Sequence, residues 1–128
     1  HHEFEADTAG KDSWRHRKAG ARQVLVSSAI RSAHFVEHET TEPELAQLLN
    51  RLLPCDLVLI EGFKREAVPK MEIFRAEVGK PHLYTEDDQI IAVASDSAVT
   101  NCPLPVLDLN DIPTIADFVL QAVGLSSR

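Results

Sequence analysis

The amino-acid sequence predicts an α/β fold with a mostly parallel sheet flanked by helices. Residues 57–60 and 90–94 are continuous apolar runs, which is typical of strands buried on both faces of a parallel sheet. Apolar residues at helical spacing precede the first run and follow residue 110, so helices and strands alternate as in α/β proteins. The chain has 128 residues, of which 44% are hydrophobic, and we expect a single domain over its whole length.

The first part of the chain is predicted to hold a helix and a pair of strands. Asp12 or Ser13 can cap a helix over about residues 14–22. Strand-like stretches follow at residues 23–28 and 31–37. We interpret them as an antiparallel hairpin or as neighbouring strands at the edge of the sheet.

A second helix is predicted from about residue 41 to residue 53. Thr41 and Glu44 have the spacing of a capping box, with Pro43 inside the first turn, and Pro54 ends the helix. The leucines of this segment repeat at helical spacing, and we expect them to face a core: Leu45, Leu48, Leu49, Leu52 and Leu53.

The second half of the chain is predicted to add the remaining strands and a terminal helix. A strand is expected near residues 71–75, a buried strand at 90–94 and a short parallel strand at 106–107. Residues 111–123 form an amphipathic helix, and Gly124 stands just after its end.

Composition excludes several partners. The formal net charge of −7 argues against a nucleic acid or an anionic membrane surface as the main partner. Cys55 and Cys102 are far apart in the sequence, and we expect reduced, partly buried thiols, as in a cytoplasmic protein. No apolar run approaches the roughly 20 residues of a membrane span, and no signal peptide is visible.

The most informative candidate site follows the apolar run at residues 57–60. Glu61, Gly62 and Lys64 come directly after it, and ligands of open α/β sheets bind beyond the carboxyl ends of the strands. A carboxylate there can hold Mg²⁺, and a glycine lets a backbone N–H approach a phosphate. This pattern indicates a Walker-B-like segment of a nucleotide-binding protein, and an ordinary turn after a buried strand is the alternative.

Several segments, in order along nearly the whole chain, together resemble the MobB family of molybdopterin-guanine dinucleotide biosynthesis adapter proteins. The segments that carry the resemblance are His1-His2-x-Phe4-x-x-Asp7, Gly10-Lys11-Asp12-Ser13, His16-Arg17-x-Ala19-Gly20-Ala21, Asp56-Leu57-Val58-Leu59-Ile60-Glu61-Gly62-Phe63-Lys64, Ile91-Ala92-Val93-Ala94-Ser95-Asp96, Leu107-Asp108-Leu109-Asn110-Asp111 and Ala116-Asp117-Phe118.

The resemblance implies a P-loop NTPase-like fold and a homodimeric GTP-binding protein that uses Mg²⁺. It also implies that the protein assists a MobA-like guanylyltransferase, and other molybdenum cofactor proteins, in attaching GMP to molybdopterin. Its own GTPase activity is expected to be weak at most, and no residue is assigned a catalytic role. Members of this family begin with a strand and a G-x-x-x-x-G-K-[ST] loop. Residues 1–128 contain no such loop, and we expect an N-terminally truncated fragment in which His1 and His2 are native.

The remaining candidate residues are interpreted in the light of this resemblance. Asp96 follows a buried strand, and its carboxylate can accept from N1–H and from the exocyclic amino group of guanine, with Ser95 assisting. A plain turn at the end of the strand is the alternative for Asp96. Asp7 and Lys11 lie in the loop that the family places beside the phosphates. Glu61 is the candidate Mg²⁺ ligand, and Lys64 can neutralise phosphate charge.

Two other functions stay open on the sequence. Glu61 and Gly62 would serve an ATP-dependent ligase similar to dethiobiotin synthetase equally well, whereas guanine recognition by Asp96 would argue against it. The chain can also be an interaction module without nucleotide chemistry. A zinc site is not expected at His34 and His38, because residues four apart on a strand lie about 13 Å apart.

Overall fold

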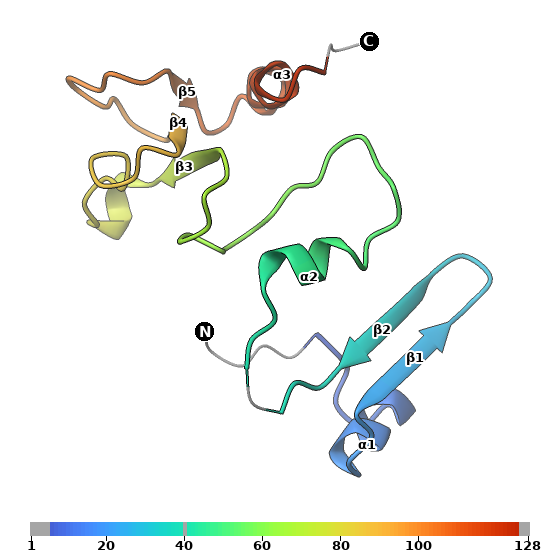
Figure 1. Ribbon diagram of the computed structural model, residues 1–128. Coiled ribbons are helices and arrows are strands. Elements are labelled where there is room, and N and C mark those ends of the chain that lie inside the picture. Colours follow the sequence, from blue (N-terminus) through green and yellow to red (C-terminus); the bar gives the residue numbers. More distant parts are fainter. Residues whose placement is uncertain (1–5, 40, 126–128) are drawn as a thin grey trace. The chain divides into compact units, whose positions relative to one another are not determined.

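The computed structural model describes residues 6–39 and 41–125, and it confirms the α/β class. The chain divides into two compact units, His1–Leu53 and Pro54–Arg128. The first unit holds an antiparallel hairpin with two helices, and the second holds a parallel sheet with a terminal helix (Figure 1). The single domain expected from the sequence stays a prediction.

Helix α1 spans Asp12–Lys18 and is shorter than the helix predicted over residues 14–22. Gly20 has a left-handed backbone with φ of 101°, and the amides of Gly20 and Ala21 donate to carbonyls of the last helical turn at 2.9 and 3.0 Å. This is a Schellman arrangement, which satisfies the last carbonyls and stops the helix. The predicted helix was too long because it included Gly20.

Strands β1 (Gln23–Ser27) and β2 (Ser32–Val36) form the predicted antiparallel hairpin. The register pairs Gln23 with Val36 at the base and Ser27 with Ser32 near the tip. Helix α1 contacts β1. The strands make a two-stranded sheet of their own, and apolar Leu25 is 69% exposed on it.

Helix α2 covers Leu45–Leu49 and is also shorter than predicted. The capping box at its start is formed by Glu44 and Gln47, and the Glu44 amide donates to the Gln47 side chain at 3.1 Å. The predicted capping box of Thr41 and Glu44 is therefore wrong. Its C-terminal end tightens into i→i−3 hydrogen bonds, which ends the α-helical turns. The predicted leucine face is realised only at its start: Leu45 is buried, whereas Leu53 is 87% exposed.

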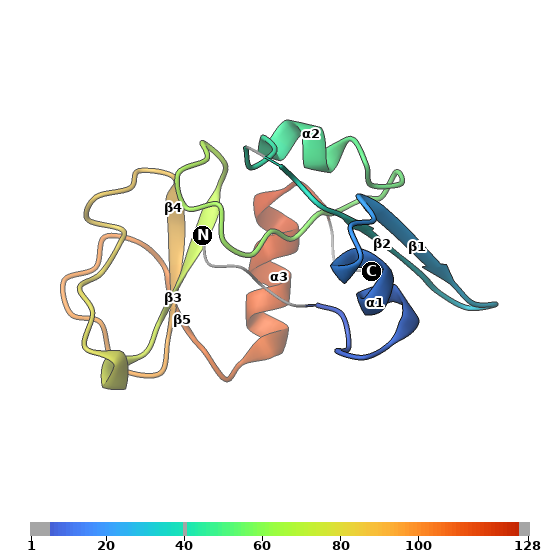
Figure 2. The same ribbon diagram turned by 90° about the horizontal axis from the view of Figure 1, so that it is seen from below.

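The second unit is built on a parallel sheet of β3 (Lys70–Phe74), β4 (Ile90–Ser95) and β5 (Val106–Asp108) in the order β3-β4-β5 (Figure 2). All three strands were predicted. The central strand carries the core, because Ala92 and Val93 have no exposed surface.

A short 3-10 helix, η1 (Ala76–Val78), follows β3, and helix α3 (Ile112–Ala122) follows β5 and contacts it. Asp111 caps α3 by accepting from the Thr114 amide at 3.2 Å. Gly124 has φ of 74° and ends the helix in a second Schellman arrangement. The predicted terminal helix is confirmed.

The strand predicted at residues 57–60 is wrong, because this segment has no regular secondary structure. Leu59 is 76% exposed. A strand in a parallel sheet needs a hydrogen-bonded neighbour, and among the described residues none pairs with this segment. The apolar run therefore carries the composition of a buried strand without the pairing that makes one.

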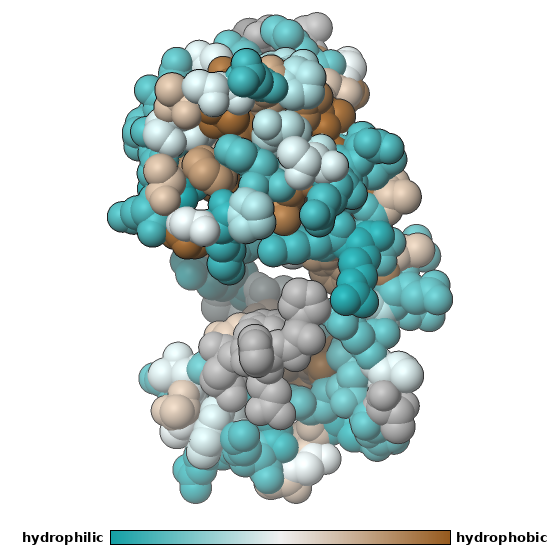
Figure 3. Space-filling model, turned by 90° about the vertical axis from the view of Figure 1, so that its left-hand side faces the viewer, coloured by the Kyte–Doolittle hydropathy of each residue, from teal (hydrophilic) through white to brown (hydrophobic). Residues whose placement is uncertain are grey.

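Other sequence expectations concern thiols and surfaces. Both cysteines are free, and Cys102 is half-buried as expected, whereas Cys55 is exposed. Figure 3 shows hydrophobic surface in brown among the hydrophilic side chains of one face. Of the helices in the described ranges, none has the length and apolar character needed to cross a membrane.

Candidate functional site

The carboxyl ends of the parallel strands bring Ser95 and Asp96 to one edge of the sheet. Asp96 Oδ1 accepts from the Ala76 amide at 3.1 Å, and the Asp96 amide donates to the Phe74 carbonyl at 3.4 Å. Asp96 therefore ties the end of β4 to the segment after β3, while its side chain stays exposed to solvent. Ligands of open α/β sheets bind at this edge.

Ser95 is buried and closes a tight turn. Its Oγ donates to the Ser97 carbonyl at 2.8 Å and accepts from the Ser97 amide at 3.1 Å. The hydroxyl thus has local partners. Ser95 acts on the neighbouring Asp96 by fixing the backbone there.

Asp108, at the end of β5, completes the same edge. Its Oδ1 accepts from the Asn110 amide at 2.8 Å. Asp111, the N-cap residue of α3, follows three residues later. Hydrogen bonds from the side chain and amide of Thr114 hold the pKa of Asp111 below its usual range. Asp108 and Asp111 thus accept from amides of their own turn and helix cap. Asp96 instead accepts from another segment, and its exposed carboxylate can accept from a base or another N–H donor.

Glu61, Gly62 and Lys64 lie in an irregular segment of the same unit. Gly62 and Phe63 both have left-handed backbones, with φ of 86° and 48°, and the Phe63 carbonyl accepts from the Glu66 amide at 3.0 Å. A non-glycine residue with positive φ is uncommon. The three candidates are exposed on a turn, and their contact with nucleotide or Mg²⁺ stays a prediction.

Within residues 6–39 and 41–125, no group of three or more His, Cys, Asp and Glu side chains is arranged to hold a metal ion. Magnesium often keeps several waters and needs only one or two carboxylates. The exposed Glu61 side chain fits that limited demand.

Asp7 and Lys11 lie in the first unit, in a loop over residues 6–11 that we name the Asp7 loop. The Asp7 carboxylate accepts from the Thr8 amide and from Ser13 Oγ, both at 2.9 Å. It also forms an ion pair with Arg17 at 3.3 Å, and its side chain is only 7% exposed. Lys11 is exposed at the N-cap position of α1, so the loop presents the lysine and buries the aspartate.

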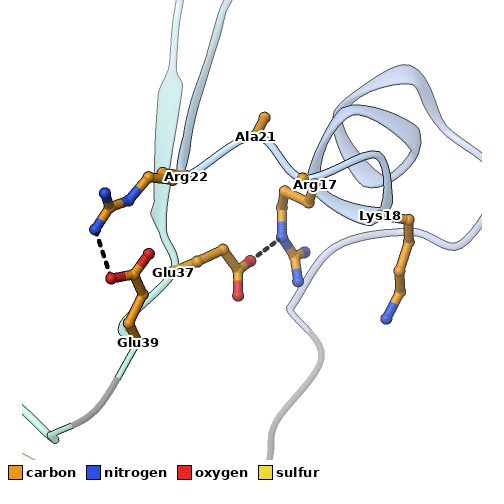
Figure 4. Close-up of a pocket in the computed structure, with 7 residues that line it drawn as sticks. Arg17, Lys18, Ala21, Arg22, Glu37 and Glu39 are labelled. Carbon is orange, nitrogen blue, oxygen red and sulfur yellow. Dashed lines mark hydrogen bonds and ion pairs between the residues drawn. The ribbon is translucent and has the colours of Figure 1, made fainter.

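Arg17 joins the Asp7 loop to the hairpin. Its Nε lies 2.6 Å from Glu37 Oε1, and its guanidinium carbon lies 5.3 Å from the centroid of the Phe35 ring. Figure 4 shows the Arg17 side chain extending from α1 to Glu37, with Arg22 paired separately to Glu39. Both ion pairs line a cavity of about 250 Å³, together with Lys18. Its two glutamates thus pair with its two arginines.

The sequence reasoning missed a buried carboxylate at Glu72. Glu72 Oε1 accepts from the Leu83 amide at 3.0 Å and lies 3.3 Å from His82 Nδ1, and Oε2 accepts from the Tyr84 amide at 3.0 Å. The His82 ring stacks on Phe74 with centroids 3.9 Å apart. The signal was a glutamate inside an apolar strand, which needs partners wherever it is buried.

Two further groups of the second unit have shifted pKa values. Burial raises the pKa of Tyr84, and the Cys102 thiol nearby raises it further. The hydrogen bond from the Gln89 amide lowers the pKa of Asp87, and Lys70 adds to this effect through an ion pair at 3.1 Å. The Lys70–Asp87 ion pair joins the segment between β3 and β4 to the first residue of β3.

Comparisons with known proteins identify the family. The family model described as "Molybdopterin guanine dinucleotide synthesis protein B" matches residues 1–96. A Haemophilus influenzae protein named molybdopterin-guanine dinucleotide biosynthesis adapter protein is 44% identical over 127 residues, covering 93% of this chain and 66% of the relative. An Escherichia coli protein of the same name is 41% identical over 125 residues, covering 94% of this chain and 71% of the relative.

The chain thus spans about two thirds of the length of the curated relatives it matches. The resemblance on which the sequence interpretation depends is confirmed, since the family model covers both the Asp7 loop and β4. The chain belongs to the MobB family.

Proposed function

We propose that this protein is a GTP-binding adapter in the conversion of molybdopterin to the guanine dinucleotide form of the molybdenum cofactor. The observation that carries the proposal is the similarity, over 93% and 94% of this chain, to two proteins named molybdopterin-guanine dinucleotide biosynthesis adapter protein. In this proposal the protein works with a MobA-like guanylyltransferase and other molybdenum cofactor proteins in the cytoplasm.

Asp96 is the residue that selects guanine in this proposal. Its carboxylate is exposed at the carboxyl edge of the sheet, and the Ala76 amide fixes Oδ1. Guanine offers N1–H and an amino group on one edge, and an ionised carboxylate can accept both. Adenine offers no such pair of donors. The fit supports GTP rather than ATP as the nucleotide, and thus an adapter rather than an ATP-dependent ligase.

Other residues are proposed to contact the phosphates of the nucleotide. Glu61 would hold Mg²⁺ directly or through water, Gly62 would present its N–H to a phosphate, and Lys64 would neutralise charge. Lys11, in the first unit, is proposed as a phosphate contact from the family resemblance alone. Mg²⁺ supplies charge neutralisation on the triphosphate. Asp7 is engaged with its own loop, so we propose that it orders Lys11 rather than touching the phosphates itself.

We further propose that the protein works as a homodimer. Among the described residues, no third strand pairs with the two-stranded hairpin. Its apolar Leu25 and Ile30 side chains are 69% and 83% exposed. A second copy can extend such a hairpin by strand addition.

A nucleotide titration on the full-length protein tests the proposal. Calorimetry with GTP and with ATP, each with and without Mg²⁺, should give tighter binding of GTP and a gain from Mg²⁺. Preference for ATP would support a ligase instead. Absence of binding to either nucleotide would leave an interaction module without nucleotide chemistry.

A further inference from the structure

We propose that Arg17 is a positioning residue that couples the β1–β2 hairpin to the Asp7 loop. The coupling itself is independent of nucleotide binding. Its consequence, that a partner on the hairpin changes how the loop presents Lys11, rests on the function proposed above.

The geometry of the Arg17 guanidinium allows it to bridge two elements. Arg17 uses two different nitrogens for two different elements: Nη1 lies 3.3 Å from Asp7 Oδ2, and Nε lies 2.6 Å from Glu37 Oε1. A planar guanidinium can hold two carboxylates in fixed directions, whereas a lysine ammonium is a single point charge. The bridge therefore requires arginine.

The ion pair between Arg17 and Asp7 is largely shielded from solvent. The side chains of Arg17 and Asp7 are 13% and 7% exposed, whereas Arg22 and Glu39 in the neighbouring pair are 71% and 64% exposed. Exposed ion pairs contribute little because water screens them. The buried pair is thus the one that can fix a loop.

Apolar packing is limited in the part of this unit that the structure describes. Among its described residues only Leu45 is buried, so apolar packing contributes little to the order of residues 6–11. Polar contacts of Asp7 with Thr8 and Ser13, and its ion pair with Arg17, hold the loop instead. Glu37 fixes the direction of Nε, so loss of this contact would weaken the hold of the guanidinium on Asp7.

The test measures loop order by ¹⁵N relaxation in the full-length protein. Backbone order parameters at Thr8 and Lys11 should be near the value of about 0.85 for rigid backbone in the unchanged protein. Glu37→Gln and Arg17→Lys should each lower them below about 0.6, the range of flexible segments. Glu39→Gln is the matched control, because it removes the same charge from the exposed pair of the same hairpin.

Chemical shifts of β1 and β2 report whether the hairpin is intact in each variant. If Arg17→Lys disturbs the hairpin, Glu37→Gln decides alone, since Glu37 is half-exposed. Unchanged order in Glu37→Gln would overturn the proposal, and so would an equal effect of Glu39→Gln. The Arg17→Lys variant tests whether the loop needs the guanidinium or only a positive charge. Lysine would preserve the order of the loop if charge alone mattered.

The same variants separate the coupling from the proposed function. GTP affinity should fall about threefold to tenfold in Glu37→Gln, because a loop that is ordered for only part of the time reduces apparent affinity by that fraction. Unchanged affinity together with a loosened loop would overturn the functional consequence. If the unchanged protein binds no GTP, the proposed function fails, while the relaxation data still decide the coupling.

Discussion

At the scale of single residues, Asp96 combines a structural hydrogen bond with an exposed carboxylate. Oδ1 accepts from the Ala76 amide, and asparagine can keep that contact through its own oxygen. The second polar atom of the asparagine side chain would be an amide nitrogen. This nitrogen is a donor and would face the N–H donors of guanine. Asp96→Asn is therefore expected to spare the fold and to change the proposed recognition of guanine.

We expect Asp96→Asn in the full-length protein to reduce the preference for GTP over ATP by at least about tenfold, because a hydrogen bond to a charged group contributes about 1.5–3 kcal/mol. Competition of GTP, xanthosine triphosphate and ATP against a labelled guanine nucleotide measures the change. Asp108→Asn, at the end of the neighbouring strand, is the control and should keep the preference. An unchanged GTP preference in Asp96→Asn would place the base site elsewhere.

Glu72 is a buried carboxylate of the second unit that accepts from the Leu83 and Tyr84 amides. Glu72→Gln would put an amino group against a backbone N–H, and we expect the free energy of unfolding to fall by about 2–3 kcal/mol. Urea denaturation measures it. Glu77→Gln, on exposed η1, removes the same charge and should have little effect. Equal stability of the two variants would contradict the assigned role of Glu72.

At the scale of elements, the apolar runs show what the sequence could predict. Residues 90–94 and 57–60 have the same strand-like composition, and only the first run became a strand, β4, because β3 and β5 pair with both of its edges. Pairing is a property of distant segments, which a local pattern cannot supply. The helix ends were missed for a local reason, because left-handed Gly20 closes α1 earlier than its polar pattern suggested.

The candidate site could also be predicted only in part. The sequence placed Ser95 and Asp96 at the end of a buried strand, which the structure confirms. It could not reveal that the Asp7 carboxylate is turned inward by Ser13 and Arg17, since the partner lies on another element. It also could not show that Glu61 follows an irregular segment.

Helix α3 gives a pH-dependent prediction. Hydrogen bonds from Thr114 lower the pKa of Asp111 in the folded state, so the carboxylate stabilises the fold above the ordinary value of about 3.9. This stabilisation is lost as the pH falls through the folded pKa. Asp111→Ala should lower Tm by a few degrees near pH 7 and by less near about pH 3.

Thermal unfolding followed by circular dichroism measures both differences. Asp117→Ala, on the exposed side of α3, is the control and should have a small effect at either pH. A constant difference between Asp111→Ala and the unchanged protein across this range would show that ionisation of Asp111 does not contribute.

At the scale of the whole molecule, exposed apolar side chains point to association. Leu25 and Ile30 on the hairpin are mostly exposed, and exposed apolar surface commonly marks interfaces. We expect light scattering at tens of micromolar to give twice the mass of one chain, and Leu25→Ser to shift the mass toward the monomer. A monomer mass for the unchanged protein would contradict the proposed dimer.

The adapter role is the central claim, and one assay tests it most directly. A MobA-like guanylyltransferase is given molybdopterin, GTP and Mg²⁺, and the guanine dinucleotide formed is measured with and without this protein in full-length form. The account predicts faster formation when the protein is present, a gain that Asp96→Asn diminishes and Asp108→Asn keeps. A rate that stays the same at every concentration of the added protein would contradict it.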